Sequence, residues 1–400
     1  MPLVTQTFNY KALMRIALVV AFVQFTNALE YMALTPVFAF MADDFSVPVS
    51  FSGYVSGMYT LGAVLSGVIA FYWIESFNKK QFLVRNTALL AVLTFCSTLI
   101  THFNTLLVLR FCAGLVGGTT MGVGLSMLIN YAPENLRGKM LATVIASFPM
   151  VSIVGMPAIL FLCTHSGWHA ALWLISILCL LSLLLVVFIL PGEPAQSGVK
   201  TALAINTETL FFASCTAVVQ FSPMLIIPIL TPLMTQYMGV EPGALSLLFL
   251  SGGVAGYLST KMSGWLLSRL SALMLAIIST LLFIASLVIP AMGFHHSLLF
   301  ITLFLGAAYS RLVAASSVAI RYPGDEQRAG FSSLQTAIMY LITTLAFFLS
   351  SLLLPDQRIT TQNLHVLFFI SALTAAGFPV MVIILQRKLA KRTLQPDQLY

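Results

Sequence analysis

The sequence predicts an all-α membrane protein with twelve transmembrane helices. Of its 400 residues, 59% are hydrophobic and only 8% are charged, whereas about a quarter of the residues in a soluble domain are charged. The mean hydropathy of +0.98 agrees, because a water-soluble surface of this size needs far more polar side chains. About 20 apolar residues span a bilayer, and twelve such stretches follow one another along the chain.

The expected spans are joined by short loops that leave no room for a soluble domain. The first is too long for the apolar segment of a secretory signal peptide, so we expect it to stay in the membrane. The longest polar interruption, 191–200, follows the sixth span. It predicts two pseudo-symmetric six-helix bundles, 1–190 and 207–400, joined by a cytoplasmic linker at 191–206, with a basic tail at the end. The spans lie near 13–41, 51–73, 82–101, 104–128, 140–163, 170–190, 207–235, 243–268, 271–292, 298–320, 331–353 and 364–386.

The positions of the basic residues predict the orientation in the membrane. Most of the 19 lysine and arginine residues fall in loops and tails on one side of the expected spans, and Arg358 falls on the other. Because basic loops remain cytoplasmic, we expect both termini in the cytoplasm. The net charge of +7 is therefore a sign of topology and does not indicate nucleic-acid binding.

A repeated pattern supports the division into halves. Val23-Gln24-Phe25 recurs as Val219-Gln220-Phe221, and Leu34-Thr35-Pro36 recurs at the same spacing as Leu230-Thr231-Pro232. Both copies lie in spans that run in the same direction, which is typical of parallel repeats in transporters. The ionisable residues are not repeated, because Ile226 stands opposite Glu30 and Thr302 stands opposite Arg110.

Glu30 is the only acidic residue that the sequence places deep within a span. A charged carboxylate at such a depth costs about 2.5 to 3.5 kcal/mol on insertion scales, so it should face the interior and bind a proton or a cation. Arg110 in the fourth span lies near enough in depth to reach it. Two interpretations stay open: a proton-coupling pair, or a fixed ion pair that joins two helices.

Other polar residues within the spans are candidates for a substrate cavity. Arg311 and Lys261 have no acidic neighbour in their half, which favours negatively charged cargo. An anionic metabolite or carboxylate siderophore is therefore the alternative substrate class. Lys261 can instead extend to the cytoplasmic headgroups, and the other candidates can instead form hydrogen bonds between helices. The candidates are Gln24, Asn27, Tyr31, Gln220, Arg311 and Lys261.

Three short motifs resemble those of the major facilitator superfamily. Residues 75–80, Glu-Ser-Phe-Asn-Lys-Lys, are similar to its loop signature, although serine and asparagine depart from the pattern. Leu106-x-x-x-Arg110-x-x-Ala113-Gly114 resembles the helix-four signature of proton-driven members, and Gly155-Met156-Pro157 resembles a helix-five motif of antiporters. Together they resemble bacterial twelve-helix drug and sugar efflux permeases.

The resemblance implies the major facilitator fold and proton-coupled efflux by alternating access. It also implies a helix-five motif at Gly155 and Pro157, and a conformational latch near the cytoplasmic loops. The latch residues are Glu75, Lys79, Lys80, Arg137 and Arg269.

The sequence contains no phosphate-binding loop, dinucleotide fingerprint or catalytic triad at a suitable junction. Histidines such as His165 and His169 do not show the convergence with carboxylates that a metal site needs. We therefore expect no enzyme activity, no cofactor and no metal. The expected partners are a small-molecule substrate, protons and the lipid bilayer, and we expect a monomer.

Overall fold

A computed structural model provides the three-dimensional structure, and it describes residues 10–73, 78–192, 206–323, 328–354 and 361–394. Within these ranges all regular structure is helical and there is no β-strand. This confirms the all-α class that the composition predicts.

The helices of the first part of the chain follow the expected spans closely. A 28-residue helix opens the chain, and the fourth and fifth expected spans are each divided into shorter elements. The elements are α1 (Tyr10–Val37), η1 (Phe38–Phe40), η2 (Val49–Phe51), α2 (Ser52–Trp73), α3 (Lys79–Cys96), α4 (Phe103–Gly117), α5 (Thr120–Tyr131), α6 (Glu134–Ile145), α7 (Ser147–Met150), η4 (Val151–Gly155), α8 (Met156–Ser166) and α9 (Trp168–Ile189).

The second part of the chain has a similar succession. Its first expected span is divided, and its last helix runs for 34 residues. The elements are α10 (Thr207–Ile226), η5 (Ile227–Ile229), α11 (Leu230–Pro232), η6 (Leu233–Tyr237), η7 (Pro242–Ala244), α12 (Leu245–Leu266), α13 (Ala272–Ala291), α14 (Ser297–Ala319), α15 (Arg328–Leu353) and α16 (Thr361–Leu394).

Proline explains where the expected span at 140–163 is interrupted. A proline has no N–H to donate to the carbonyl four residues earlier. Pro149 removes the bond to Ile145, the last residue of α6, and the π-helical turn η4 lies just before Pro157. Likewise α10 ends at Ile226, two residues before Pro228. In these spans the α-helix is therefore interrupted by a short π-helical or 3-10-helical turn.

Ten helices in the described ranges are long and apolar enough to cross a membrane. They match ten of the twelve expected spans, and the other two expected spans correspond to α2 and α3. The 18 residues of α3 include Lys79, Lys80 and Arg85, which explains why its apolar signal is weaker than that of the other helices.

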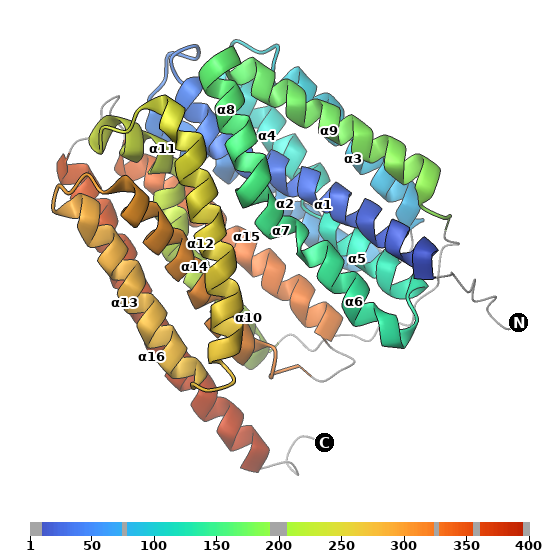
Figure 1. The fold of residues 1–400 in the computed structure, drawn as a ribbon. Coiled ribbons are helices and arrows are strands. Elements are labelled where there is room, and N and C mark those ends of the chain that lie inside the picture. Colours follow the sequence, from blue (N-terminus) through green and yellow to red (C-terminus); the bar gives the residue numbers. More distant parts are fainter. Residues whose placement is uncertain (1–9, 74–77, 193–205, 324–327, 355–360, 395–400) are drawn as a thin grey trace, which may run out of the picture.

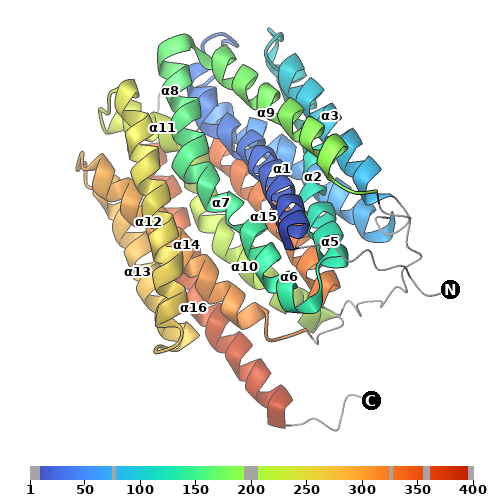
Figure 2. The ribbon, with the colours of Figure 1, turned by 45° about the vertical axis from the view of Figure 1, so that its right-hand side comes forward.

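The helices form two groups in space. In Figure 1 the elements from α1 to α9, coloured blue to green, lie together on one side, and those from α10 to α16 lie on the other. Figure 2, turned by 45°, keeps this division. α2 packs against α15, and α8 packs against α12, so these pairs join the two groups.

The α2–α15 contact is closest where α2 begins and α15 ends, away from the start of α1. Ser351 Oγ donates to Ser50 O at 2.6 Å, and Ser52 Oγ donates to Pro228 O at 2.5 Å. A Cβ atom on Gly53 would overlap Phe347 O. We call this region, formed by Ser50, Ser52, Gly53, Pro228 and Ser351, the contact end.

Candidate functional site

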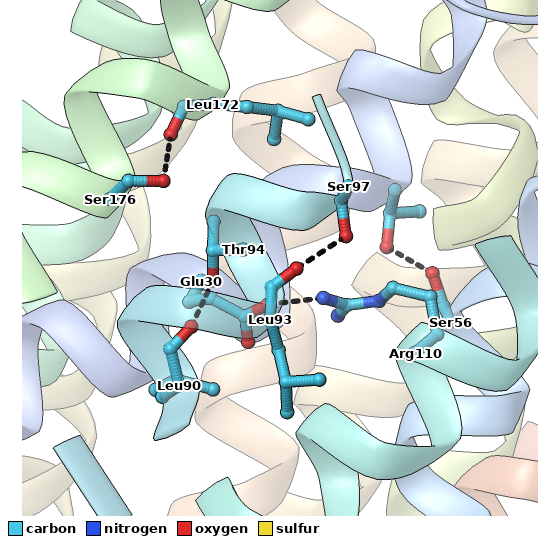
Figure 3. A network of polar contacts seen from close by, with 10 residues as sticks. Glu30, Ser56, Leu90, Leu93, Thr94, Ser97, Arg110, Leu172 and Ser176 are labelled. Carbon is cyan, nitrogen blue, oxygen red and sulfur yellow. Dashed lines mark hydrogen bonds and ion pairs between the residues drawn. The ribbon is translucent and has the colours of Figure 1, made fainter. Parts of the chain in front are cut away.

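The structure brings Glu30 of α1 and Arg110 of α4 into a buried ion pair. Arg110 Nη1 donates to Glu30 Oε1, and each side chain is only 2% exposed. Figure 3 shows the guanidinium directed at the carboxylate, with Thr94 of α3 beside it. Two residues that are 80 positions apart in sequence thus form one charged site inside the helical membrane region.

Small residues on α4 allow this approach. A Cβ atom on Gly114 would overlap the backbone of Tyr59 on α2, and one on Gly117 would overlap the Tyr59 hydroxyl group. Glycines permit such close packing of helices within a membrane. The backbone of α4 therefore lies directly against α2, which places Arg110 beside the Tyr59 ring, with 4.8 Å between Cζ and the ring centroid.

The ion pair leaves several polar atoms without partners in the described part of the chain. Glu30 Oε2, Arg110 Nε and Arg110 Nη2 are buried and accept or donate no hydrogen bond there. A buried charge pair whose remaining hydrogen-bonding groups are unsatisfied recovers less of its desolvation cost than a fully satisfied pair. Such a site favours rearrangement when a proton or a polar ligand arrives.

Two predicted cavity residues of α1 lie beside this pair. Tyr31 is half-buried and stacks on Tyr59 with 5.0 Å between ring centroids. Asn27 Nδ2 donates to Gly117 O at 3.2 Å, so its amide joins α1 to α4. Gln24, one turn earlier on α1, is buried. The first-half candidates thus cluster around Glu30 and Arg110.

The second-half candidates are distributed differently. Gln220 on α10 is half-buried, and Lys261 on α12 is exposed, with its Nζ atom 4.9 Å from the Tyr257 ring centroid. Arg311 on α14 is fully buried. Its guanidinium lies 4.7 Å from the Phe283 ring on α13, and Nη2 donates to Ala375 O on α16 at 3.4 Å. Arg311 is thus enclosed by α13, α14 and α16.

The helix-five motif lies against α1 next to Glu30. A Cβ atom on Gly155, the last residue of η4, would lie 2.7 Å from Leu29 Cδ1. Pro157 follows within the first turn of α8. The motif therefore combines a helix interruption with a close approach to the residue that precedes Glu30.

The predicted latch falls partly outside the described residues. Glu75 lies outside them, and so does the side chain of Arg137. Lys79 and Lys80 begin α3, whose N-cap Asn78 accepts from Gln81 N at 3.1 Å. Asn78 is one of the residues that depart from the family's loop signature. Its side chain has a structural role here, because it caps α3.

Arg269, the latch residue of the second half, is exposed. Its guanidinium lies 4.2 Å from the Trp265 ring centroid. This contact joins two residues that are close together in sequence. It does not connect Arg269 to Lys79 and Lys80 at the start of α3. The latch as a whole stays a prediction.

The sequence reasoning did not single out Tyr59 or Tyr340. Tyr340 of α15 meets Tyr31 edge-on, with 6.3 Å between centroids, and so brings the second group of helices to the site. For Tyr59, the glycine-rich run at 114–118 was an available signal, because it predicts a partner helix in close contact. For Tyr340 the sequence holds no comparable signal.

The fold and the buried acid–base pair define a polytopic helical membrane protein with an ionisable centre. The family model of the Major Facilitator Superfamily matches residues 20–207. This match covers just under half of the chain, and together with the relatives and solved structures that follow it makes the chain similar to transporters of the major facilitator superfamily.

Two bacterial relatives illustrate the similarity. The uncharacterized MFS-type transporter YtbD of Bacillus subtilis (strain 168) is 22% identical over 253 residues, which is 62% of this chain and 63% of the relative. The purine ribonucleoside efflux pump NepI of Escherichia coli (strain K12) is 21% identical over 258 residues, which is 64% of each chain. The alignments thus span less than two thirds of these relatives.

Solved structures share the fold over nearly the whole chain. The nucleoside transporter NupG has a TM-score of 0.73 at 13% identity, covering 93% of this chain and 98% of that one. A bacterial homolog of the human lysosomal transporter Spinster has a TM-score of 0.68 at 14% identity, covering 94% and 96%. At these identities the comparison shows the fold.

Proposed function

We propose that the protein is a proton-coupled efflux transporter of a small molecule that works by alternating access, with Glu30 as the proton carrier. The observation that carries the proposal is the buried Glu30–Arg110 pair, since an ionisable residue within a membrane segment is a functional site by default. When Glu30 binds a proton, Arg110 loses its counter-ion and becomes available to substrate or water. Proton and substrate thus compete for one site.

The architecture in this proposal has twelve spans, because α2 and α3 cross the membrane with the other ten helices. Residues 1–190 and 207–400 form six-helix halves that rock against each other around the site. The positions of the basic loops support cytoplasmic termini, and with that orientation the contact end would face outward. Glu75, Lys79, Lys80, Arg137 and Arg269 would then act at the opposite, cytoplasmic ends of the helices.

The energetics are sufficient for export. One elementary charge crossing a membrane potential of about 150 mV gains roughly 3.5 kcal/mol. That free energy sustains a concentration ratio of between two and three decades. The name of the relative NepI supports efflux and suggests a purine ribonucleoside as the first substrate to test.

The test is transport by full-length protein in proteoliposomes under an imposed pH gradient. The substrate panel contains a radiolabelled purine ribonucleoside, a neutral sugar, a cationic dye and a carboxylate metabolite. Glu30→Gln keeps the shape of the side chain but cannot ionise, so gradient-driven flux is expected to fall at least about 100-fold, the low end of the contribution of one positioned proton-transfer group.

The matched control is Glu241→Gln, which changes an exposed glutamate and should transport like the wild type. Flux that survives unchanged in Glu30→Gln overturns the proposal. Loss of gradient-driven flux in both variants also overturns the specific role of Glu30.

The second candidate function is transport of an anionic substrate that Arg311 and Lys261 bind. Its support is that Arg311 Nε and Nη1 have no hydrogen-bond partner among the described residues. The enclosure of Arg311 by Phe283, Phe378 and the α16 backbone and the exposure of Lys261 make this candidate weaker. Selective loss of carboxylate transport on charge reversal of Arg311 would favour it.

A further inference from the structure

We propose that three tyrosines in contact, Tyr59, Tyr31 and Tyr340, transmit the ionisation state of Glu30 to α15 and so to the contact end. The inference rests on the proposed function and adds positioning residues to it. The chain of contacts starts at the Arg110 guanidinium, 4.8 Å from the Tyr59 ring centroid. It continues by the 5.0 Å stack of Tyr59 on Tyr31 and ends at Tyr340, 6.3 Å from Tyr31.

The first link responds to charge. Arg110 is shared between a carboxylate and the face of an aromatic ring, and a desolvated guanidinium is attracted strongly to such a face. Neutralising Glu30 removes one of the two attractions and leaves the other. The guanidinium is then held by Tyr59 alone, so its position relative to α2 changes.

Tyr59 cannot absorb that change alone, because its surroundings are tightly packed. Its ring is 1% exposed, and Gly114 and Gly117 bring the α4 backbone against it. The Tyr59 ring also stacks on Tyr31, which follows Glu30 directly in α1. A movement of either Glu30 or Arg110 therefore changes the Tyr31–Tyr59 stack.

The last link crosses to the second group of helices. Tyr340 lies on α15, and Thr344, one turn further toward the contact end, donates from Oγ1 to Thr60 Oγ1 at 2.7 Å. Tyr59 and Thr60 are neighbours on α2, so this hydroxyl bond between α2 and α15 lies next to the tyrosine chain. Aromatic pairs and hydroxyl bonds of this kind have discrete geometries. They favour one relative placement of α2 and α15 over others.

Proton binding can shift an equilibrium between two states only if the proton interacts differently with each. The tyrosine chain provides that difference, because Tyr340 belongs to the group of helices that moves relative to Glu30. Within the described residues, the charged and titratable side chains that interact with Glu30 are Arg110 on α4, Tyr59 on α2 and Cys179 on α9. Tyr31 on α1 and Tyr340 on α15 follow through the Tyr59 ring.

The experiment measures distances across the contact end and needs no identified substrate. Spin labels are placed at two exposed residues, Asp43 and Leu352, in full-length protein whose five native cysteines are changed to alanine. Distance distributions are recorded in proteoliposomes at about pH 5 and about pH 9, a range that includes the titration of buried carboxyl groups. The ratio of long to short distances reports opening of the contact end.

We expect the ratio to change with pH in the wild type and to be constant in Glu30→Gln. Tyr340→Leu should reduce the pH-driven change by about 2- to 10-fold, the equivalent of losing one aromatic pair. Tyr340→Phe keeps the ring and should behave like the wild type. The control Tyr257→Leu removes a half-buried tyrosine outside the chain and should also behave like the wild type.

The outcomes separate the two proposals. If Glu30→Gln abolishes the pH response but Tyr340→Leu and Tyr31→Leu both retain it in full, the tyrosine chain is rejected and the role of Glu30 stands. If Glu30→Gln responds like the wild type, or the wild type does not respond, the coupling role of Glu30 is rejected as well. Tyr31→Leu replaces the middle ring and serves as the test if Tyr340→Leu fails to fold.

Discussion

Adding a single methyl group at Gly53 should open the contact end. Gly53 lies near the start of α2, and a Cβ atom there would overlap both Phe347 O and Ser351 Oγ on α15. The carbonyl oxygen belongs to a helix backbone and cannot rotate away. Gly53→Ala therefore forces α2 and α15 apart at the point where they join the two groups of helices.

The size of the effect follows from the cost of overpacking. Inserting a methyl group into a well-packed contact costs about 1 to 3 kcal/mol. If that cost falls only on the state in which α2 and α15 touch, the ratio of open to closed molecules rises by roughly 5- to 100-fold. Spin labels at Asp43 and Leu352 would report the change as a growing long-distance population.

The matched control lies on the same helix. Gly67 has no atom within 4 Å of an added Cβ, so Gly67→Ala gives the same chemical change without the clash. Equal distance distributions in Gly53→Ala, Gly67→Ala and the parent protein would refute the reasoning. A loss of folded protein in Gly53→Ala alone would show that the contact is permanent and not one side of a conformational change.

Two further predictions concern the other contacts between helices. Gly253→Ala on α12 places a Cβ atom 2.7 Å from Ser152 O and should shift the same equilibrium. Gly264→Ala on the same helix meets no atom within 4 Å and should not; equal distance distributions for the two variants would contradict this prediction. Arg311→Met should raise the melting temperature, because a buried cation without an acidic partner in the described ranges is replaced by an apolar side chain. A fall in melting temperature, measured in detergent, would show that the contacts of Arg311 with aromatic rings outweigh its desolvation.

The sequence was sufficient for the helical architecture because the membrane imposes simple rules. Lengths of apolar segments and the positions of basic loops are local properties, and they located the spans to within a few residues. The positions at which the α-helix of a span is interrupted also follow from local chemistry, as Pro149 and Pro228 show.

Only the charged residues of the candidate site could be predicted from the sequence. Glu30 and Arg110 are conspicuous because a charge inside a span is costly, and the structure pairs them. The sequence does not distinguish Tyr59, Tyr340 and Thr344 in this way, because tyrosine and threonine are common in membrane helices. Their importance depends on which helices touch, and that information is distributed over the glycines that allow the contacts.

The unequal halves give a reason why a link between them is needed. At the position that repeats Glu30 the second half has Ile226, which is fully buried. At the position that repeats Arg110 it has Thr302, which is half-buried and bonds to its own helix. No charge of the second half can therefore replace the ion pair. In the proposed mechanism, proton binding acts on the first half alone, whereas alternating access requires both halves to move. The side chains that cross between α1, α2 and α15 must then carry the coupling, and Tyr340 meets the site most directly.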